Sequence, residues 1–428
     1  MFVHLVAGLV LAAVPTTPAY STHGDDRLEA LIEEALQNNP AILQAFADYQ
    51  AALHRVPQAT ALPDPTLSLT QFARSVETRV GSQQRMLAVS QRIPGLGKRA
   101  AKGQLAIKSA SVGDEIYKAA KAEIVLRMKH VYYDLGFLDR ALEASREDEA
   151  LLGHFEELAR RRYAQGFGLQ GDAIRLQAQI TQAIQRRRQL MGQRIDLEAS
   201  LNALRDVPAD TPVPEVRLAE LPDLDLEWES LFETGRLSRP EIRASLLRIE
   251  EREKSVHLAR IRHRPDFTLG LTWGNIRARG IDTAAIPILG NGKDSYGISV
   301  GLTLPLFRGK YAAAVREASE QFSAARFAYR DSAKKMEAEV RSISFRIETI
   351  ADQIDLYRRA LVPQAEQALR STEAAYSNGT VEVTGLLDIQ RMLLDVQLGL
   401  ARLQSDYLKA VADLERAIGA AVPEEVSS

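Results

Sequence analysis

Cysteine is absent from the 428 residues of this chain. Its absence excludes disulfide bonds, thiolate metal sites, a cysteine nucleophile and a lipid-modified N-terminal cysteine. Aromatic residues make up only 6% of the sequence, and the net charge of -2 gives no basic excess that would favour a nucleic-acid partner. Beyond the N-terminal segment, no run approaches the ~18 apolar residues of a membrane-spanning helix. If the mature chain enters a membrane, it must do so through strands.

The sequence also lacks the signatures of catalysis. It contains no phosphate-binding loop, nucleophile elbow or zinc-binding helix motif. The seven histidines never stand four positions apart, the spacing that places two ligands on one helix face, and the six methionines are scattered. We therefore expect no enzyme activity, no cofactor and no metal site.

Residues 1–21 have the pattern of a secretory signal peptide. An apolar segment extends from Met1 to Val14, and small residues follow it up to Ser21. His4 stands where a lysine or arginine is expected, so a buried N-terminal helix is the alternative interpretation.

The rest of the chain has the composition of long helices, with abundant Ala, Leu, Gln, Glu and Arg. No proline occurs between Lys98 and Arg162, which predicts a helix of roughly 100 Å, far longer than a globular helix. Apolar residues also recur every seven positions, which favours left-handed coiled-coil packing. These residues are Val315, Phe322, Tyr329, Met336, Ile343, Ile350 and Tyr357, and then Leu386, Leu393, Leu400, Tyr407 and Leu414.

Four segments instead alternate with a period of two: residues 66–72, 85–93, 267–273 and 295–304. Each has one apolar face and one face of Ser, Thr or Gly. A soluble β-domain is one explanation, but a lipid-facing band with a polar lumen fits the pattern better. An open sheet edge in lipid leaves backbone groups unpaired, so four strands cannot stand alone. Three chains would supply twelve strands, a number within the range of known barrels.

The order of these elements is given twice. We expect a first repeat at 28–205, with strands at about 65–93, and a second at 227–420, with strands at about 266–305. A proline-rich linker, 206–226, joins them, and residues 421–428 form a C-terminal tail. Helix-breaking pairs, Asn39-Pro40 and Arg239-Pro240, stand 200 positions apart.

A turn is also repeated, at residues 163–172 and 376–388. Tyr163 and Tyr376 are 213 positions apart, and so are Gly166 and Gly379. Glycine is the residue with which a helix ends in the left-handed conformation. A single copy would indicate an ordinary helix corner, whereas two copies at one spacing indicate a duplicated unit.

This arrangement resembles the TolC-type outer membrane efflux family over most of the chain. The most specific residues are Tyr376-Ser-Asn-Gly379-Thr380 with Leu387-Asp388, the prolines Pro94 and Pro305 after the strands, and the two helix-breaking pairs. The resemblance implies a mainly α-helical chain with a small membrane β part. It implies a homotrimer in the outer membrane lipid of a Gram-negative bacterium, with a 12-stranded β-barrel continued by a periplasmic α-helical barrel. The implied function is the exit duct of a tripartite efflux system for small molecules or metal ions.

The resemblance also assigns roles to residues. Pro94, Gly97, Pro305 and Gly309 correspond to the junctions between strands and helices. The turns correspond to periplasmic tips at which the adaptor of an inner membrane pump docks; their residues are Tyr163, Gly166, Tyr376, Gly379 and Thr380.

Acids beside the tips form the periplasmic aperture in this family, and the matching residues are Asp388 and Asp172, with Glu382 as a further candidate. The alternative for Asp172 and Asp388 is that acids in a first helical turn complement the helix dipole. Two family positions differ: Gly385 replaces a second acid, and Val381 replaces an arginine that can latch the tip.

Three other functions are compatible with parts of this architecture. A type I secretion exit channel would share the architecture, and a soluble periplasmic adaptor or a cytoplasmic coiled-coil scaffold would share the long helices. The segment Ile93–Arg99 is similar to members associated with heavy-metal resistance.

Overall fold

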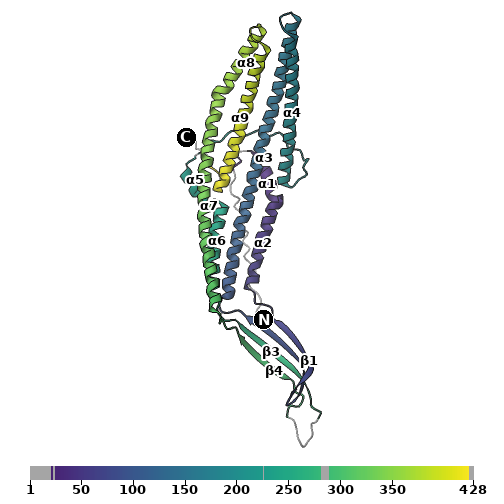
Figure 1. Cartoon of the computed structure of the whole chain (residues 1–428), viewed down its shortest axis with the longest axis vertical. Coiled ribbons are helices and arrows are strands. Elements are labelled where there is room, and N and C mark those ends of the chain that lie inside the picture. Colours follow the sequence, from purple (N-terminus) through teal and green to yellow (C-terminus); the bar gives the residue numbers. More distant parts are fainter. Residues whose placement is uncertain (1–20, 23–24, 225, 281–288, 424–428) are drawn as a thin grey trace. The chain divides into compact units, whose positions relative to one another are not determined.

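The computed structural model describes residues 21–22, 25–224, 226–280 and 289–423 (Figure 1). The predicted signal peptide, apart from Ser21, lies outside them, as do residues 424–428 of the predicted tail. The chain divides into two compact units. Unit 1 comprises the residues up to Phe46, Glu115–Arg243 and the residues from Asp331 onward, and unit 2 comprises Ala47–Asp114 and Ala244–Arg330.

The helices occur in the predicted order. In the first half they are α1 (Asp26–Asn38), α2 (Pro40–Thr60), α3 (Lys98–Ala164) and α4 (Gln170–Arg205). In the second half they are α5 (Trp228–Ser238), α6 (Pro240–Ile261), α7 (Arg308–Leu356), α8 (Val362–Ser377) and α9 (Val383–Ile418). Within the described ranges, no helix is both long enough and apolar enough to cross a membrane.

Both predicted helix breaks are present. Asn39 and Arg239 have extended backbone, with ψ of 123° and 120°, because the following proline disfavours the helical conformation. Asn39 also caps α2, since its Oδ1 accepts the amide of Ala41 at 2.9 Å, and its amide nitrogen donates to the carbonyl of Leu204 at 2.8 Å.

One helical feature was not predicted. Between α7 and α8, residues Tyr357–Leu361 form a π-helical turn (η1), in which the amide of Val362 donates to the carbonyl of Tyr357. Pro363 follows at once and has no N–H with which to continue the α-helical ladder. Tyr357 packs against α9 at Gly399, where a Cβ would come within 2.9 Å of the ring. Pro363 is the residue from which an interruption of the helix could have been predicted.

Unit 2 contains one antiparallel sheet in the order β1-β2-β3-β4, so strands from both predicted repeats join. The strands are β1 (Thr66–Thr78), β2 (Gly81–Ile93), β3 (Phe267–Arg277) and β4 (Ser295–Leu302). The first hairpin is longer than predicted. Residues between the predicted segments 66–72 and 85–93, such as Glu77 and Gly81, lie in strands that a two-residue turn joins. The register shifts between Gln71 and Val76.

The strand register aligns the apolar positions on one face of the sheet. Leu67 pairs with Val89, Val89 with Leu271, and Leu271 with Ile298. The opposite face carries Ser, Thr and Gly; for example, Ser90 pairs with Gly270. The apolar face is exposed in the single chain, and Ile298 is 81% accessible. An apolar surface of this extent marks contact with lipid or protein.

The core of unit 1 follows the predicted seven-residue period where helices pack. In α7 the residues Met336, Val340, Ile343 and Ile347 are buried at spacings of four and three. The proline-rich segment 206–226 adds to this core, because Val213 and Val216 are buried in it. An ion pair between Arg194 and Asp139 supports the segment, and Asp139 accepts the amide of Val216 at 2.8 Å.

Candidate functional site

The two repeated turns of unit 1 have the same hydrogen-bonding pattern. In the first, the amide of Gly166 donates to the carbonyl of Tyr163 at 3.0 Å, and that of Phe167 to Arg162 at 2.9 Å. In the second, Gly379 donates to Tyr376 at 3.0 Å, and Thr380 to Ala375 at 3.0 Å.

This is the Schellman arrangement, which places a left-handed residue after the helix. Gly166 and Gly379 have φ of 81° and 78°, as the sequence pattern predicted. The side chain of Thr380 adds a further hydrogen bond to the Ala375 carbonyl at 2.9 Å.

A shared core lies beneath both turns. It contains residues of four helices: Leu152, Phe155 and Ala159 of α3, Leu176 and Ala183 of α4, Leu369 and Tyr376 of α8, and Val383, Leu386 and Leu387 of α9. Tyr376, only 1% exposed, anchors the second turn in this core, whereas its counterpart Tyr163 is 50% exposed. The two turns therefore differ in how firmly they are held.

Arg162, near the end of α3, joins the two turns directly. Its Nη1 donates to the carbonyl of Tyr376, and its Nη2 donates to the carbonyl of Phe167 at 3.1 Å. The guanidinium lies 4.7 Å from the centre of the Tyr376 ring, within the range of a cation–π interaction. A Cβ on Gly379 would come within 3.0 Å of Nη2, so glycine also leaves room for this contact. Sequence reasoning missed Arg162, because it stands in a run of three arginines that resembles a solvated surface.

The predicted aperture acids have different surroundings. Asp172 is half-buried in the first turn of α4, and its negative charge acts on the hydroxyl of Tyr376. The pKa of the Tyr376 hydroxyl is raised, first by burial and then by the charge of Asp172, against the opposing effect of Arg162. Asp388 is exposed and is the sixth residue of α9, whose first turn contains no acid. The helix-dipole interpretation therefore applies to Asp172 but is wrong for Asp388.

Glu382 is the third predicted acid. It precedes α9 at the N-cap position, where its side chain makes no capping hydrogen bond, and it is exposed.

A buried acid that sequence reasoning did not single out lies below the turns. Asp148 of α3 is 5% exposed and accepts a hydrogen bond from the Nε2 of Gln390. Burial raises the pKa of Asp148, against the lowering effects of Gln390 and of Arg186 at 3.8 Å. Gln177, which stands 213 positions before Gln390, likewise donates to an acid of α3, Glu156, at 3.0 Å. The helix that follows each turn, α4 or α9, is therefore hydrogen-bonded to α3 through one of these two glutamines.

The predicted junction residues lie in unit 2, where strands lead into helices. Pro94 and Gly97 connect β2 to α3, and Gly97 has φ of 84°. Pro305 connects β4 to α7. Gly309 differs from Gly97, because it is the second residue of α7 and has open space around it. The two glycines, expected as equivalents, therefore occupy different conformations.

Asp266, immediately before β3, holds the first junction together. Its carboxylate accepts the amide of Gly95 at 2.8 Å and the Nζ of Lys98 at 2.8 Å, and it pairs with Arg92 at 2.6 Å. Burial alone would raise the pKa of Asp266, but these three donors outweigh it and lower the pKa to about 2.

Comparison with known proteins agrees with this arrangement of elements. The sequence profile of the family described as outer membrane efflux protein (OEP) matches residues 31–206 and 232–420. The chain belongs to the outer membrane efflux protein family. A curated member, the outer membrane protein TolC of Vibrio cholerae, is 23% identical over 94% of this chain and 92% of its own length. The Escherichia coli TolC is 22% identical over 92% of this chain and 82% of its own length.

Solved structures of efflux channels share the fold. The outer membrane protein VceC of V. cholerae matches with a TM-score of 0.74 and 22% identity over 92% of this chain and 96% of that one. The CmeC outer membrane channel of Campylobacter jejuni matches with a TM-score of 0.75 and 17% identity over 94% of this chain and 87% of that one.

The family membership confirms the resemblance found in the sequence. The protein is an outer membrane efflux channel, an exit duct that extends into the periplasm, and its mainly α-helical fold with a small antiparallel sheet is that of the TolC-type channels. None of these findings favours a secretion channel, a soluble adaptor or a cytoplasmic scaffold. The roles of the individual tip and junction residues remain predictions.

Proposed function

We propose that three copies of this chain form one duct, in which the sheets of unit 2 close into a twelve-stranded barrel. The apolar face that carries Val89, Leu271 and Ile298 would contact outer membrane lipid, and the Ser, Thr and Gly face would line the pore. The edge strands of the sheet, β1 and β4, would pair between neighbouring copies, which satisfies backbone groups that lipid cannot. The exposure of this apolar face in the single chain is the observation that supports the proposal.

The paired turns would form the periplasmic entrance, at which the adaptor of an inner membrane pump docks. The shared core and Arg162 join both turns of one protomer, so an adaptor that bound either turn would move both. Transport would be passive in this chain, with energy supplied at the inner membrane. The chain would therefore act without catalysis.

Asp388 is the acid that we assign to the aperture. It is exposed, and no hydrogen bond or ion pair involves it in the part of the chain that the structure describes. Three copies would place three unpaired carboxylates around the entrance, where they would attract cations. Asp172, in contrast, interacts electrostatically with Tyr376 and lies in the first turn of α4, where the helix dipole stabilises an acid.

Channel recording tests this assignment. We would reconstitute the purified protein in planar bilayers and measure conductance and block by La³⁺ added on the entrance side. Asp388→Asn should weaken the block, because removing a ring of charge lowers the local cation concentration. Asp352→Asn is the matched control, since Asp352 is also exposed and lies on another helix, α7. Equal block in the two variants would remove Asp388 from the aperture, and a protein that remained a monomer in detergent would contradict the trimeric duct.

A further inference from the structure

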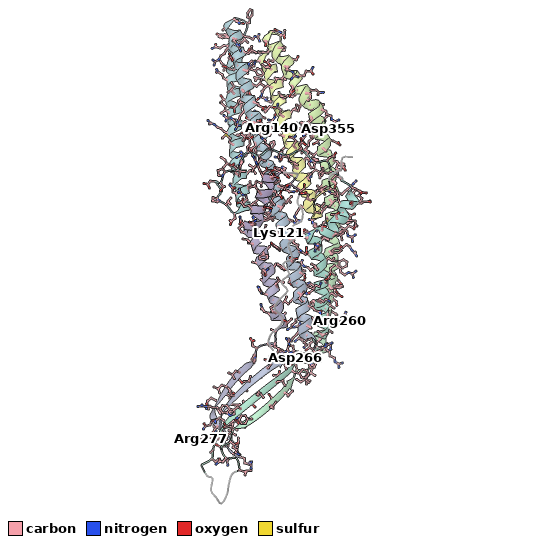
Figure 2. The ribbon with its side chains drawn as sticks, turned by 180° about the vertical axis from the view of Figure 1, so that it is seen from behind. Lys121, Arg140, Arg260, Asp266, Arg277 and Asp355 are labelled. Atoms are coloured by element: carbon pink, nitrogen blue, oxygen red, sulfur yellow. The ribbon has the colours of Figure 1, made fainter. Side chains whose placement is uncertain are left out.

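A cavity of about 580 Å³ lies in unit 2, where the strands meet the helices. It is bounded by the ends of β2 and β4, by the last turns of α6, and by the first turns of α3 and α7. Asp266, at the helix-proximal end of β3, marks its position in Figure 2. The volume is within the range of small-molecule binding sites.

Cations dominate the lining of this cavity. They are Arg92, Lys98, Lys102, Arg262, Arg264 and Lys310, against the acids Asp266 and Glu317. Asp266 is already shared between Arg92 and Lys98, and Arg264 donates to the carbonyl of Leu96 at 2.6 Å.

For the remaining three cations, Lys102, Arg262 and Lys310, no ion pair is found with any residue that the structure describes. Glu317 accepts a hydrogen bond from Gln321 at 3.4 Å. The cavity therefore carries positive charge that its own acids do not neutralise.

The ion pairs with Asp266 give Arg92 and Lys98 a role in folding stability, but no such contact among the described residues explains the three unpaired cations. The N-terminus of a helix carries a partial positive charge and is stabilised by acids, not by cations. Yet neither α3 nor α7 has an acid in its first turn. α3 begins with Lys98 and Arg99, and α7 begins with Arg308 and, two residues later, Lys310. Two helix N-termini and the unpaired cations thus add their positive potentials at one cavity. Such a local conflict with folding preferences is expected where a site serves a function.

The strand register shows on which side of the sheet the cluster lies. Arg92 pairs with Thr268, two residues along β2 from Ser90, which pairs with Gly270. Arg92 therefore belongs to the Ser, Thr and Gly face, opposite the apolar face of Val89 and Leu271. In the proposed duct the apolar face meets lipid, so the cluster opens toward the pore.

We infer that this cavity binds the anionic group of a transported molecule, a carboxylate, sulfate or phosphate, as the cargo passes from the helices into the strands. The inference rests on the proposed function, because only a closed duct brings solutes to this face. Three cavities would form a ring of positive potential, which would draw anionic cargo onward from an entrance that concentrates cations. Exposed lysines hold an anion only loosely, and a duct requires binding that releases its cargo.

Block of reconstituted channels by citrate, a tricarboxylate, tests the inference. The test variant is Lys102→Gln with Lys310→Gln, and a charge-preserving variant replaces the same two lysines by arginine. The matched control is Lys334→Gln with Lys335→Gln, since these two exposed lysines of α7 lie in unit 1 and pair with Glu337 and Asp331.

Loss of two cations should raise the citrate concentration for half-block by roughly fivefold at low salt. The arginine variant and the α7 control should block like the wild type. Equal block in all four channels overturns the inference while the proposed duct stands. A change that depends instead on the phosphatidylglycerol content of the bilayer also overturns it, because the cluster would then contact lipid.

Absence of channels in the wild-type protein would be a failure of the proposed function itself. If the double variant fails to assemble, the single variants Lys102→Gln and Lys310→Gln decide the matter. Each should raise the half-block concentration roughly twofold, and unchanged block in both overturns the inference.

Discussion

Replacing Arg162 by alanine should loosen the connection between the two tip turns while leaving each turn folded. Arg162 donates two hydrogen bonds, to Tyr376 and Phe167, and its guanidinium lies 4.7 Å from the Tyr376 ring centre. A hydrogen bond from a half-exposed charged donor contributes about 1 kcal/mol, and an exposed cation–π contact contributes about 0.5–1 kcal/mol. The bond to Phe167 lies within the first turn, so only the Tyr376 hydrogen bond and the cation–π contact couple the two turns. The substitution should therefore cost about 1.5–2 kcal/mol of coupling. This corresponds to a roughly 10- to 30-fold shift toward separated tips.

Amide hydrogen exchange measures this shift. The amides of Phe167 and Thr380 close the two turns, and both should exchange faster, because separated turns open more often. Arg161→Ala is the matched control, because the neighbouring Arg161 is 58% exposed and, among the residues that the structure describes, forms an ion pair only with Glu157, at 3.6 Å. Arg162→Lys should lie between the wild type and the alanine variant, since lysine keeps the charge but cannot donate in two fixed directions.

The result can also contradict the reasoning. If Arg162→Ala and Arg161→Ala show the same exchange at both turns, the contacts of Arg162 contribute nothing, and the core and polar contacts beneath the turns hold the tips together. The same pair of variants should differ in bilayers, where Arg162→Ala should spend more time in high-conductance states than Arg161→Ala.

Two further predictions concern the strand–helix junction. Because the pKa of Asp266 is lowered to about 2 from about 3.8, its stabilising effect should be complete above about pH 4 and be lost as the pH falls toward 2. Asp266→Asn should accordingly lower the thermal unfolding temperature at pH 7 but not at pH 2, and a pH-independent loss would contradict the charge argument. Gly97→Ala should destabilise the protein by about 1–2 kcal/mol, because φ is 84° there, whereas Gly309→Ala, in helical backbone, should be neutral or slightly stabilising. Denaturation of both glycine variants would separate the two cases, and equal losses would contradict the assignment.

Periodic features of the fold could be predicted because each follows from the local chain. The alternation in residues 267–273 predicts two faces, and the register of β3 with its neighbours places those faces as expected. The glycines at 166 and 379 predict left-handed helix ends, since few other residues adopt that conformation cheaply. The alternation fails after Gln71, where a register shift occurs, and there the predicted strand ended too early.

Contacts between distant segments could not be predicted in the same way. Arg162 reaches Tyr376 across 214 positions, and a run of arginines predicts only a charged surface. Asp266 meets Lys98 across 168 positions, and only the pairing of β2 with β3 brings these residues together. Pro363, in contrast, was a local signal for the π turn.

The two tips share one sequence pattern but are not equivalent, and Arg162 shows how they differ. The position that corresponds to Arg162 in the second copy is Ala375, 213 residues later. Alanine has no side-chain donor, so the second turn cannot make an equivalent contact to the first. The contact therefore runs in one direction, from Arg162 beside the first turn to the buried Tyr376 of the second. The second tip gains an anchored tyrosine and keeps Asp388 unpaired, whereas the first places Asp172 beside that same tyrosine.

A symmetric pair of tips would give one set of contacts twice. The contact of Arg162 with Tyr376 lies within one protomer, so in the proposed trimer it forms or breaks independently in each subunit. Cooperative opening of the entrance would then have to come from contacts between subunits and not from Arg162.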